Sequence, residues 1–223
     1  MIDFIIHTKG DLKEAIDAYG ILPFFANEIK GFSIEEHCDP KVYFGEEPGV
    51  WEWKGPVIQE LKCAYGKFFL KKAAFVKKEW YYDLANYRRD GYDFDARYDD
   101  GLAQYRDKLL YDLVEQNAPV ISKRLKQLGN YKKGGNKGFD TIITRLQAQG
   151  YVIISDFVYM KDKYGNPYGW GVAEYSTPEA FMGGSFTDKV YSRSPEESYE
   201  RLLEHFTRLF PNEDVGKIKK FLG

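Results

Sequence analysis

The residues best suited to chemistry lie in an aromatic cluster around position 52. Glu52 stands between Trp51 and Trp53. A carboxylate among tryptophans can position a water molecule or stabilise a cationic sugar, and the rings can stack an extruded base. The pattern therefore suggests a base-binding pocket with Glu52 as its candidate catalytic residue. The candidate pocket residues are Trp51, Trp53, Lys54, Tyr65, Lys67 and Phe69.

The same cluster also has a structural interpretation. If residues 50–53 form a strand, Trp51 and Trp53 share one face, and such a face is more often core than pocket. Glu52 would then point to solvent or pair with a lysine such as Lys54 or Lys67. The residues alone leave both interpretations open, and the structural one is the commoner.

Basic residues form a second candidate site. Residues 119–150 carry seven basic side chains and one acidic one, and residues 62–89 carry eight and two, although the whole chain has a formal charge of −2. Local charge matters to a polyanion, because charges beyond about 8 Å of physiological salt are largely screened. The two segments suggest either phosphate binding or ordinary solvated helix faces. The candidate DNA-binding residues are Lys123, Arg124, Lys126, Lys132, Lys133, Lys137, Thr141, Thr144, Arg145, Lys161 and Lys163.

Helical periodicity predicts three helices that position these residues. Leu102, Tyr105, Leu109, Leu110 and Leu113 recur at helical spacing and predict one apolar face. A shorter helix follows over 120–128, and a third follows over 139–150. The third helix buries its apolar side and presents threonine and arginine, which can contact phosphates and guanine edges.

A β-hairpin follows the third helix directly. Residues 151–159 predict a strand, 163–167 a turn, and 168–175 a return strand. Three helices followed by a hairpin is the order of a winged helix, in which the third helix can enter a major groove. Winged helices also serve as protein-interaction modules, so the order alone does not decide the partner.

The remaining elements are less regular. Asp11 and Ser33 predict helix starts, whereas residues 50–53 and 66–70 suggest short strands or tightly packed turns. Residues 79–100 have no clean period and suggest a loop with short helical turns.

The C-terminal segment predicts two further helices. Ser194, followed by Pro195 and by Glu197 at the third helical position, begins a helix to about Leu209, and a last helix runs over 215–222. The whole pattern predicts an α+β fold: a winged helix-turn-helix domain, a smaller mixed α/β N-terminal region and a C-terminal helical extension packed on the body. The expected boundaries are 1–95 for the N-terminal region, 96–183 for the winged-helix domain and 184–223 for the extension.

Cysteine and histidine are scarce. Cys38 and Cys63 are the two cysteines, and there are three histidines. These numbers and spacings exclude a zinc finger, a haem-attachment motif and a disulfide scaffold, so we expect no metal, no cofactor and a reducing cytoplasmic compartment. No apolar run approaches the roughly 20 residues needed to cross a bilayer. We expect no secretory signal at residues 1–7 and no membrane association.

Several longer strings resemble one protein family. They are Val50-Trp51-Glu52-Trp53-Lys54-Gly55-Pro56, Tyr65-Gly66-Lys67-Phe68-Phe69, Tyr87-Arg88-Arg89-Asp90-Gly91-Tyr92, Gly138-Phe139-Asp140-Thr141 and Tyr164-Gly165-Asn166-Pro167-Tyr168-Gly169-Trp170-Gly171. They resemble a family of bacterial proteins described as AlkZ-related, and the resemblance covers nearly the whole chain. That family is similar, more distantly, to the winged-helix DNA glycosylases of the AlkZ type, which excise alkylated or crosslinked purines. The resemblance implies a winged-helix protein that acts on or binds DNA.

The sequence departs from AlkZ-type glycosylases at their catalytic motif. Those enzymes hold the attacking water with a Gln-x-Gln motif near the N-terminus, whereas the first glutamine here is Gln59. The string Gln147-Ala148-Gln149 lies at the end of the third predicted helix, so the catalytic role does not transfer to it. If hydrolysis occurs, another group must position the water, and Glu52 is the candidate.

The residues and the resemblance leave three functions open. The first is a winged-helix protein, related to DNA-repair glycosylases, that binds intact or damaged double-stranded DNA without an implied reaction. The second is a DNA glycosylase that excises damaged purines with Glu52 in the site. The third is a non-catalytic protein-interaction module whose basic faces meet an acidic protein. Nothing in the sequence indicates the oligomeric state.

Overall fold

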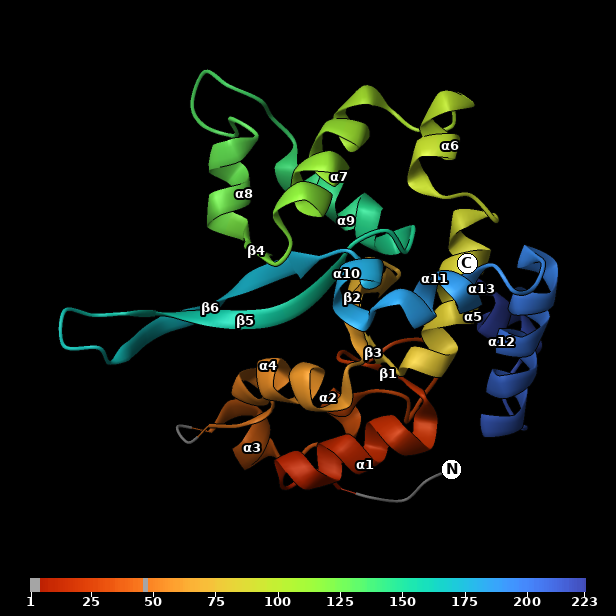
Figure 1. Ribbon diagram of the computed structural model, residues 1–223. Helices are drawn as coiled ribbons and strands as arrows, with labels where there is room; N and C mark the ends of the chain where they lie inside the picture. Colours follow the sequence, from red (N-terminus) through yellow and green to blue (C-terminus); the bar gives the residue numbers. More distant parts are fainter. Residues whose placement is uncertain (1–4, 46–47) are drawn as a thin grey trace.

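Two small antiparallel sheets form the centre of the computed structural model, which describes residues 5–45 and 48–223 (Figure 1). The first sheet has the order β1-β3-β2, and its strands are β1 (Ile21–Pro23), β2 (Ala64–Phe69) and β3 (Lys72–Val76). The second has the order β4-β6-β5, and its strands are β4 (Val120–Ile121), β5 (Ile153–Lys161) and β6 (Pro167–Ser176). Helices surround both sheets, which confirms the predicted α+β class. Residues 1–4, part of the segment considered for a secretory signal, lie outside the described residues.

Four helices belong to the N-terminal part of the chain. They are α1 (Lys9–Tyr19), α2 (Ile34–His37), α3 (Pro40–Phe44) and α4 (Val50–Leu61). Helix α1 begins earlier than the sequence suggested: Thr8 is the N-cap, and Asp11 closes a capping box as its third helical residue. The predicted cap at Ser33 is confirmed, because its side chain accepts a hydrogen bond from the Glu36 backbone N–H.

The short strand or tightly packed turn predicted at residues 50–53 is wrong, because these residues form the first turn of α4. Glu52 caps this turn, with its carboxylate accepting the Gly49 backbone N–H at 2.9 Å. Pro56 lies inside the helix and weakens its local propensity, but Val57 and Ile58 are fully buried and offset that loss.

Helix α4 lies against the hairpin at Gly55. A Cβ atom at this position would come within 2.3 Å of Asp156 Oδ1 and 3.2 Å of the Phe157 backbone nitrogen. Glycine therefore allows α4 to approach β5 closely. Four residues along the helix, Gln59 Nε2 donates a hydrogen bond to the Ser155 carbonyl at 2.8 Å.

The loop predicted at residues 79–100 is also wrong. It folds into α5 (Lys78–Arg89) and α6 (Phe94–Asp99). Helix α5 buries Asp83, Asn86 and Arg89 together with its apolar residues. Polar residues on the buried face hide the apolar period, which is why the sequence pattern missed this helix.

The three helices before the hairpin are confirmed as α7 (Tyr105–Asn117), α8 (Ser122–Leu128) and α9 (Phe139–Ala148). In α9 the predicted apolar face is buried as expected. The predicted face of α7 is wrong in part, because Leu102 lies before the helix and Tyr105 is exposed, whereas the polar Asp107 is buried. The hairpin is confirmed as β5 and β6, and its tip extends away from the body (Figure 1).

The chain ends in four helices: α10 (Pro178–Met182), α11 (Gly184–Val190), α12 (Pro195–Leu209) and α13 (Val215–Leu222). The predicted capping box at Ser194 is confirmed. Helix α12 packs against α5, at the opposite end of the molecule from the hairpin tip (Figure 1). Buried residues from all parts of the chain join in one hydrophobic core. Among the described residues, no helix is both long and apolar enough to cross a bilayer.

Candidate nucleic-acid interface

The exposed side of α9 forms one wall of a cavity of about 560 Å³, here named the α9 groove. Its lining residues are Lys67, Lys71, Asp140, Thr141, Thr144, Arg145 and Ala148. The predicted face of the third helix and two lysines more than 65 positions earlier in the chain therefore share one surface. The two lysines come from β2 and the turn that follows it, and both are exposed.

A buried glutamine joins β2 to α9. Gln147 Oε1 accepts the backbone N–H of Lys67 at 3.1 Å, and its amide nitrogen donates to the Ile143 carbonyl at 3.0 Å. Gly66 permits this approach, because a Cβ atom there would lie 3.1 Å from the same amide oxygen. Gln147 thus has a structural task that brings Lys67 to the groove.

Arg145 lines the groove but its guanidinium is engaged within the protein. Its Nε donates to Asp107 Oδ2 at 2.8 Å, and its Nη2 donates to Asp107 Oδ1 and, at 3.3 Å, to Gln104. Asp107 is almost fully buried. The hydrogen bond and charge of Asp107 raise the pKa of Arg145. A guanidinium held in this fork is not available for the bidentate contact with guanine that we considered from the sequence.

The N-terminal end of the α9 groove contains an ion pair. Lys126 Nζ from α8 lies 3.3 Å from Asp140 Oδ1 and 4.7 Å from the centroid of the Phe139 ring. The pair is exposed, so its stabilisation is small. The pair matters more for an anionic ligand, because Lys126 partly neutralises Asp140, the one carboxylate among the lining residues of the groove.

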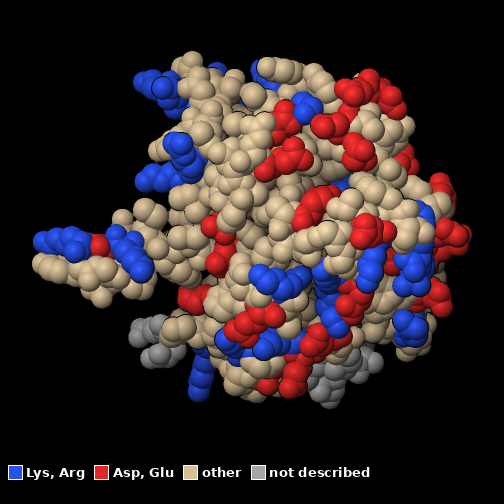
Figure 2. Space-filling model, in the orientation of Figure 1, with Lys and Arg blue, Asp and Glu red and all other residues tan. Residues whose placement is uncertain are grey.

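Other predicted DNA-binding residues are exposed on two separate elements. Those on α8 and the loop after it are Lys123, Arg124, Lys132, Lys133 and Lys137. Lys161 and Lys163 lie at the hairpin tip. Figure 2 shows basic side chains over α8 and its following loop, and again at the tip, on the same side of the molecule.

At least four of the eight basic residues at 62–89 are engaged within the protein or buried. Arg88 donates to the Leu222 carbonyl, Lys72 to the Ala26 carbonyl at 2.8 Å, and Lys78 to the Met182 carbonyl at 2.8 Å. Arg89 is fully buried. The net charge of residues 62–89 is therefore larger than the positive charge that this segment can present to a polyanion.

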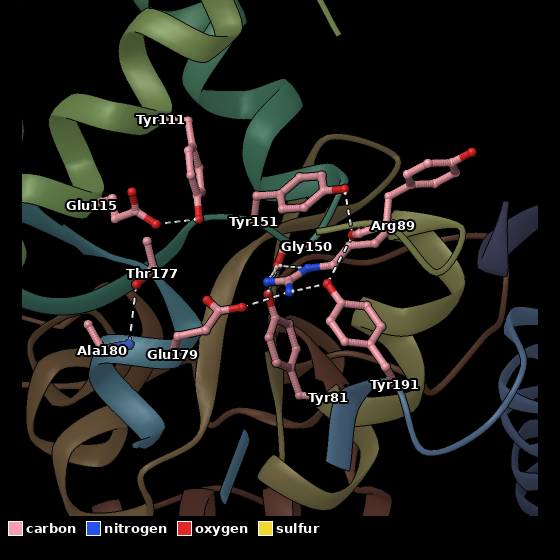
Figure 3. Close-up of polar contacts among 11 residues, drawn as sticks. Tyr81, Arg89, Tyr111, Glu115, Gly150, Tyr151, Thr177, Glu179, Ala180 and Tyr191 are labelled. Atoms are coloured by element: carbon pink, nitrogen blue, oxygen red, sulfur yellow. Dashed lines mark hydrogen bonds and ion pairs between the residues drawn. The ribbon is translucent and has the colours of Figure 1, made fainter. Parts of the chain in front are cut away.

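Arg89 lies at the centre of a buried polar network that the sequence did not reveal (Figure 3). Its Nη1 donates to Glu179 Oε1 at 2.7 Å and to the Tyr191 hydroxyl at 3.0 Å, while Nε and Nη2 donate to the Gly150 carbonyl at 3.2 and 2.9 Å. Burial opposes its charge, but Glu179 and Tyr191 outweigh that effect and raise the pKa of Arg89. Since Gly150 follows α9, the network holds the end of this helix against α5 and α10.

A second cavity, of about 230 Å³, lies between α4 and the hairpin and is here named the aromatic cavity. Its lining residues are Trp51, Lys54, Phe157, Tyr159, Trp170 and Gly171. Trp51 and Lys54 were predicted pocket residues, whereas the four hairpin residues were not. None of the described residues that line it is an aspartate or a glutamate.

The six predicted pocket residues do not line one cavity. Tyr65 is buried and contacts Phe157, with ring centroids 5.7 Å apart. Lys67 belongs to the α9 groove, Phe69 stacks on Phe221 in the core, and Trp53 packs against the core on another side of α4. Glu52, as described above, caps α4.

The surroundings of Lys54 are unusual for a cation. Its Nζ lies 4.3 Å from the centroid of the Phe157 ring, 4.8 Å from that of Trp51 and 5.7 Å from that of Phe24. Burial lowers the pKa of Lys54 to about 8, against the opposing charge of Glu52. Ring faces stabilise the ammonium only in part.

Within residues 5–45 and 48–223, no group of three or more histidine, cysteine or acidic side chains is placed to hold a metal ion. Cys38 and Cys63 are buried, and burial raises the pKa of both thiols, that of Cys38 to about 11 and that of Cys63 to about 12.

The fold and the site define an α+β protein with a basic groove along the third helix of a three-helix and hairpin unit. The family model described as AlkZ related matches residues 6–223, so the chain belongs to this family. No curated protein and no solved structure matches the chain.

Proposed function

We propose that this protein is a winged-helix protein that binds double-stranded DNA through the α9 groove, with the β5–β6 hairpin as its wing. The winged-helix domain of this proposal spans residues 96–183. The order α7, β4, α8, α9, β5 and β6, with β4 paired to β6, supports the assignment. The observation that carries the proposal is the shared groove of Lys67 and Lys71 with the exposed face of α9.

The chemistry of the groove suits a phosphate backbone. Lys67 and Lys71 supply exposed ammonium groups, and Thr141 and Thr144 supply hydroxyl donors beside them. Such contacts position a duplex without specifying its sequence. Because Arg145 is held by Asp107, the groove supports backbone contact better than base recognition. Membership of the AlkZ-related family supports DNA as the polyanion, because AlkZ-type enzymes act on damaged DNA.

Base excision is not part of the proposal. Glu52 caps α4, and the described residues around the aromatic cavity include no carboxylate to activate water. A glycosylase reaction would therefore require a group that the geometry does not supply at this place. Incubation with a duplex that contains an alkylated purine, followed by a search for abasic product, tests this point; product that disappears in Glu52→Gln would contradict us.

The binding test is fluorescence anisotropy with a labelled duplex over a series of salt concentrations. Affinity is expected to fall steeply with salt, because lysines that contact phosphates release counterions. The double variant Lys67→Glu/Lys71→Glu is expected to weaken binding by at least about tenfold and to reduce the salt slope by about 2. The matched control, Arg208→Glu/Lys219→Glu, reverses two exposed charges on α12 and α13 and is expected to bind as the wild type does.

Three results would overturn the proposal. Binding that is flat between low and moderate salt removes the phosphate contacts. Equal losses in the groove variant and in the control show that only net charge matters. If the monodisperse protein binds no duplex at all, the protein-interaction alternative is favoured instead.

A further inference from the structure

The aromatic cavity contains one group able to react, the amine of Lys54. Trp51 and Lys54 come from α4, and Phe157, Tyr159 and Trp170 come from the hairpin. The wall is apolar except for this amine and the Tyr159 hydroxyl. Trp170 is 80% exposed and forms part of the rim, so the cavity opens at the surface.

A glycine of the hairpin shapes the wall of the cavity opposite α4. At Gly171 a Cβ atom would lie 3.0 Å from the Phe157 Cβ and 3.2 Å from the Tyr159 ring. Glycine therefore lets the Phe157 side chain and the Tyr159 ring lie close over β6, and both line the cavity opposite α4. The close approach of α4 at Gly55 holds Lys54 against that wall.

A lysine in such surroundings is suited to nucleophilic chemistry. Desolvation among aromatic rings disfavours the ammonium, and the nearby Glu52 already accepts the Gly49 N–H. With a pKa of about 8, a substantial part of Lys54 is neutral in slightly alkaline solution. Neutral amines of desolvated lysines are the groups that attack carbonyl carbons to form imines.

We propose that Lys54 forms an imine with the aldehyde of a ring-opened abasic deoxyribose, which enters the aromatic cavity from the hairpin side. The lone pair of the neutral Nζ adds to the aldehyde carbon, the nitrogen gives up its two protons, and the carbonyl oxygen leaves with them as water while a C=N bond forms. One water is released, and no electrons are gained or lost. This inference rests on the proposed binding of DNA.

The size and position of the cavity favour a sugar without its base. A volume of about 230 Å³ accommodates a sugar between rings. An abasic nucleotide makes no base pair, so it leaves the helical stack at little cost. Lys161 lies two residues beyond Tyr159 along β5, a distance of about 7 Å, and Lys163 follows. These exposed lysines are placed to contact the phosphates that flank such a sugar.

The test is reductive trapping. The full-length protein is incubated at about pH 8 with a duplex that contains one abasic site and with cyanoborohydride, which reduces an imine to a stable amine. We expect a covalent protein–DNA adduct on a denaturing gel, and peptide mass spectrometry is expected to locate it at Lys54. Lys54→Arg is expected to give at least about tenfold less adduct, because a guanidinium does not form this imine and keeps its charge.

Lys62→Arg is the matched control, since Lys62 lies at the end of the same helix and is exposed. It is expected to form as much adduct as the wild type. Anisotropy with the same abasic duplex, together with a thermal melt, is measured for each variant, so that loss of binding or folding is separated from loss of reaction.

Each outcome decides a different claim. A bound duplex without adduct, an adduct at another lysine, or equal adduct with Lys54→Arg overturns the inference and leaves the proposed DNA binding intact. If no duplex is bound, the proposed function fails, and deoxyribose 5-phosphate replaces the duplex as the aldehyde. Selective modification of Lys54 by that sugar then supports the imine chemistry with a free sugar as its source, whereas no selective modification overturns it.

Discussion

Replacement of Arg89 by methionine tests whether the buried network maintains this part of the fold. Methionine has a similar length but no charge and no donor, so Glu179 loses its ion pair and Tyr191 loses a hydrogen-bond partner. Removal of one partner of a buried ion pair destabilises proteins by about 3–5 kcal/mol. The exposure of the Glu179 side chain is 33%, so water can solvate part of the remaining charge.

The other acceptor of Arg89 is less affected. The Gly150 carbonyl loses the hydrogen bonds from Nε and Nη2, but the Tyr81 hydroxyl still donates to it at 3.1 Å. A carbonyl that keeps one donor avoids most of the penalty of an unsatisfied buried acceptor. We therefore expect the lower end of the range, a loss of about 3 kcal/mol in the free energy of unfolding.

Urea denaturation followed by far-UV circular dichroism measures this loss. The double variant Arg89→Met/Glu179→Met is expected to be more stable than the single variant, because the uncompensated carboxylate is gone. Arg208→Met, at an exposed position of α12, is expected to change stability by no more than about 0.5 kcal/mol. A loss of less than about 1 kcal/mol for Arg89→Met, or a double variant no better than the single one, would refute the reasoning.

Three further perturbations follow from the structure. Arg145→Ala is expected to lower the free energy of unfolding by about 3 kcal/mol, because it leaves the buried Asp107 without its ion-pair partner. Urea denaturation measures this loss, and a change within about 0.5 kcal/mol would show that the pair is dispensable. Gly20→Ala is expected to lower the free energy of unfolding by about 2 kcal/mol, because Gly20 has φ +70° and a Cβ atom would lie 2.4 Å from the Trp80 ring. A thermal melt should show a lower midpoint, and an unchanged midpoint would contradict this. Burial lowers the pKa of His205 below its ordinary value of 6.5. The unfolded chain therefore binds a proton at this residue more readily than the native protein does, so the free energy of unfolding is expected to fall as the pH drops below about 6.5. His205→Gln is expected to flatten the dependence of the unfolding free energy between about pH 7 and pH 5, and identical slopes in the two proteins would exclude His205 as the cause.

The sequence predicted best those elements whose burial is uniformly apolar. Helix α9 buries Phe139, Ile142, Ile143 and Leu146, so its period is visible in the sequence. The hairpin was equally clear, because a run of β-branched and aromatic residues stands on each side of a turn at Gly165.

Elements held by distant partners were not predictable in this way. Helix α5 buries Asp83, Asn86 and Arg89, whose partners lie more than 60 residues further along the chain. Helix α4 contains Pro56, which indicates a break unless its burial against the hairpin is known. Local patterns carry no information about such partners, so tertiary packing decided both elements.

Only the part of the candidate site that lies on a single helix was predictable from the sequence. The exposed face of α9 follows from its period, whereas the addition of Lys67 depends on a hydrogen bond to Gln147, 80 residues away. The aromatic cavity shows the same division, since Trp51 and Lys54 stood out in the sequence and their partners from the hairpin did not. Side chains that meet across different elements require the fold before they can be grouped.

The base of the hairpin contacts elements that belong to both candidate surfaces. Strand β5 packs against α4 on one side and against β2 on another. Gln59 donates to the Ser155 carbonyl of β5, and Gly66 and Lys67 of β2 lie against Gln147 of α9. The base of the hairpin is therefore held by the same elements that carry Lys54 and Lys67. The two surfaces therefore share one support, whereas the hairpin tip extends away from the body (Figure 1).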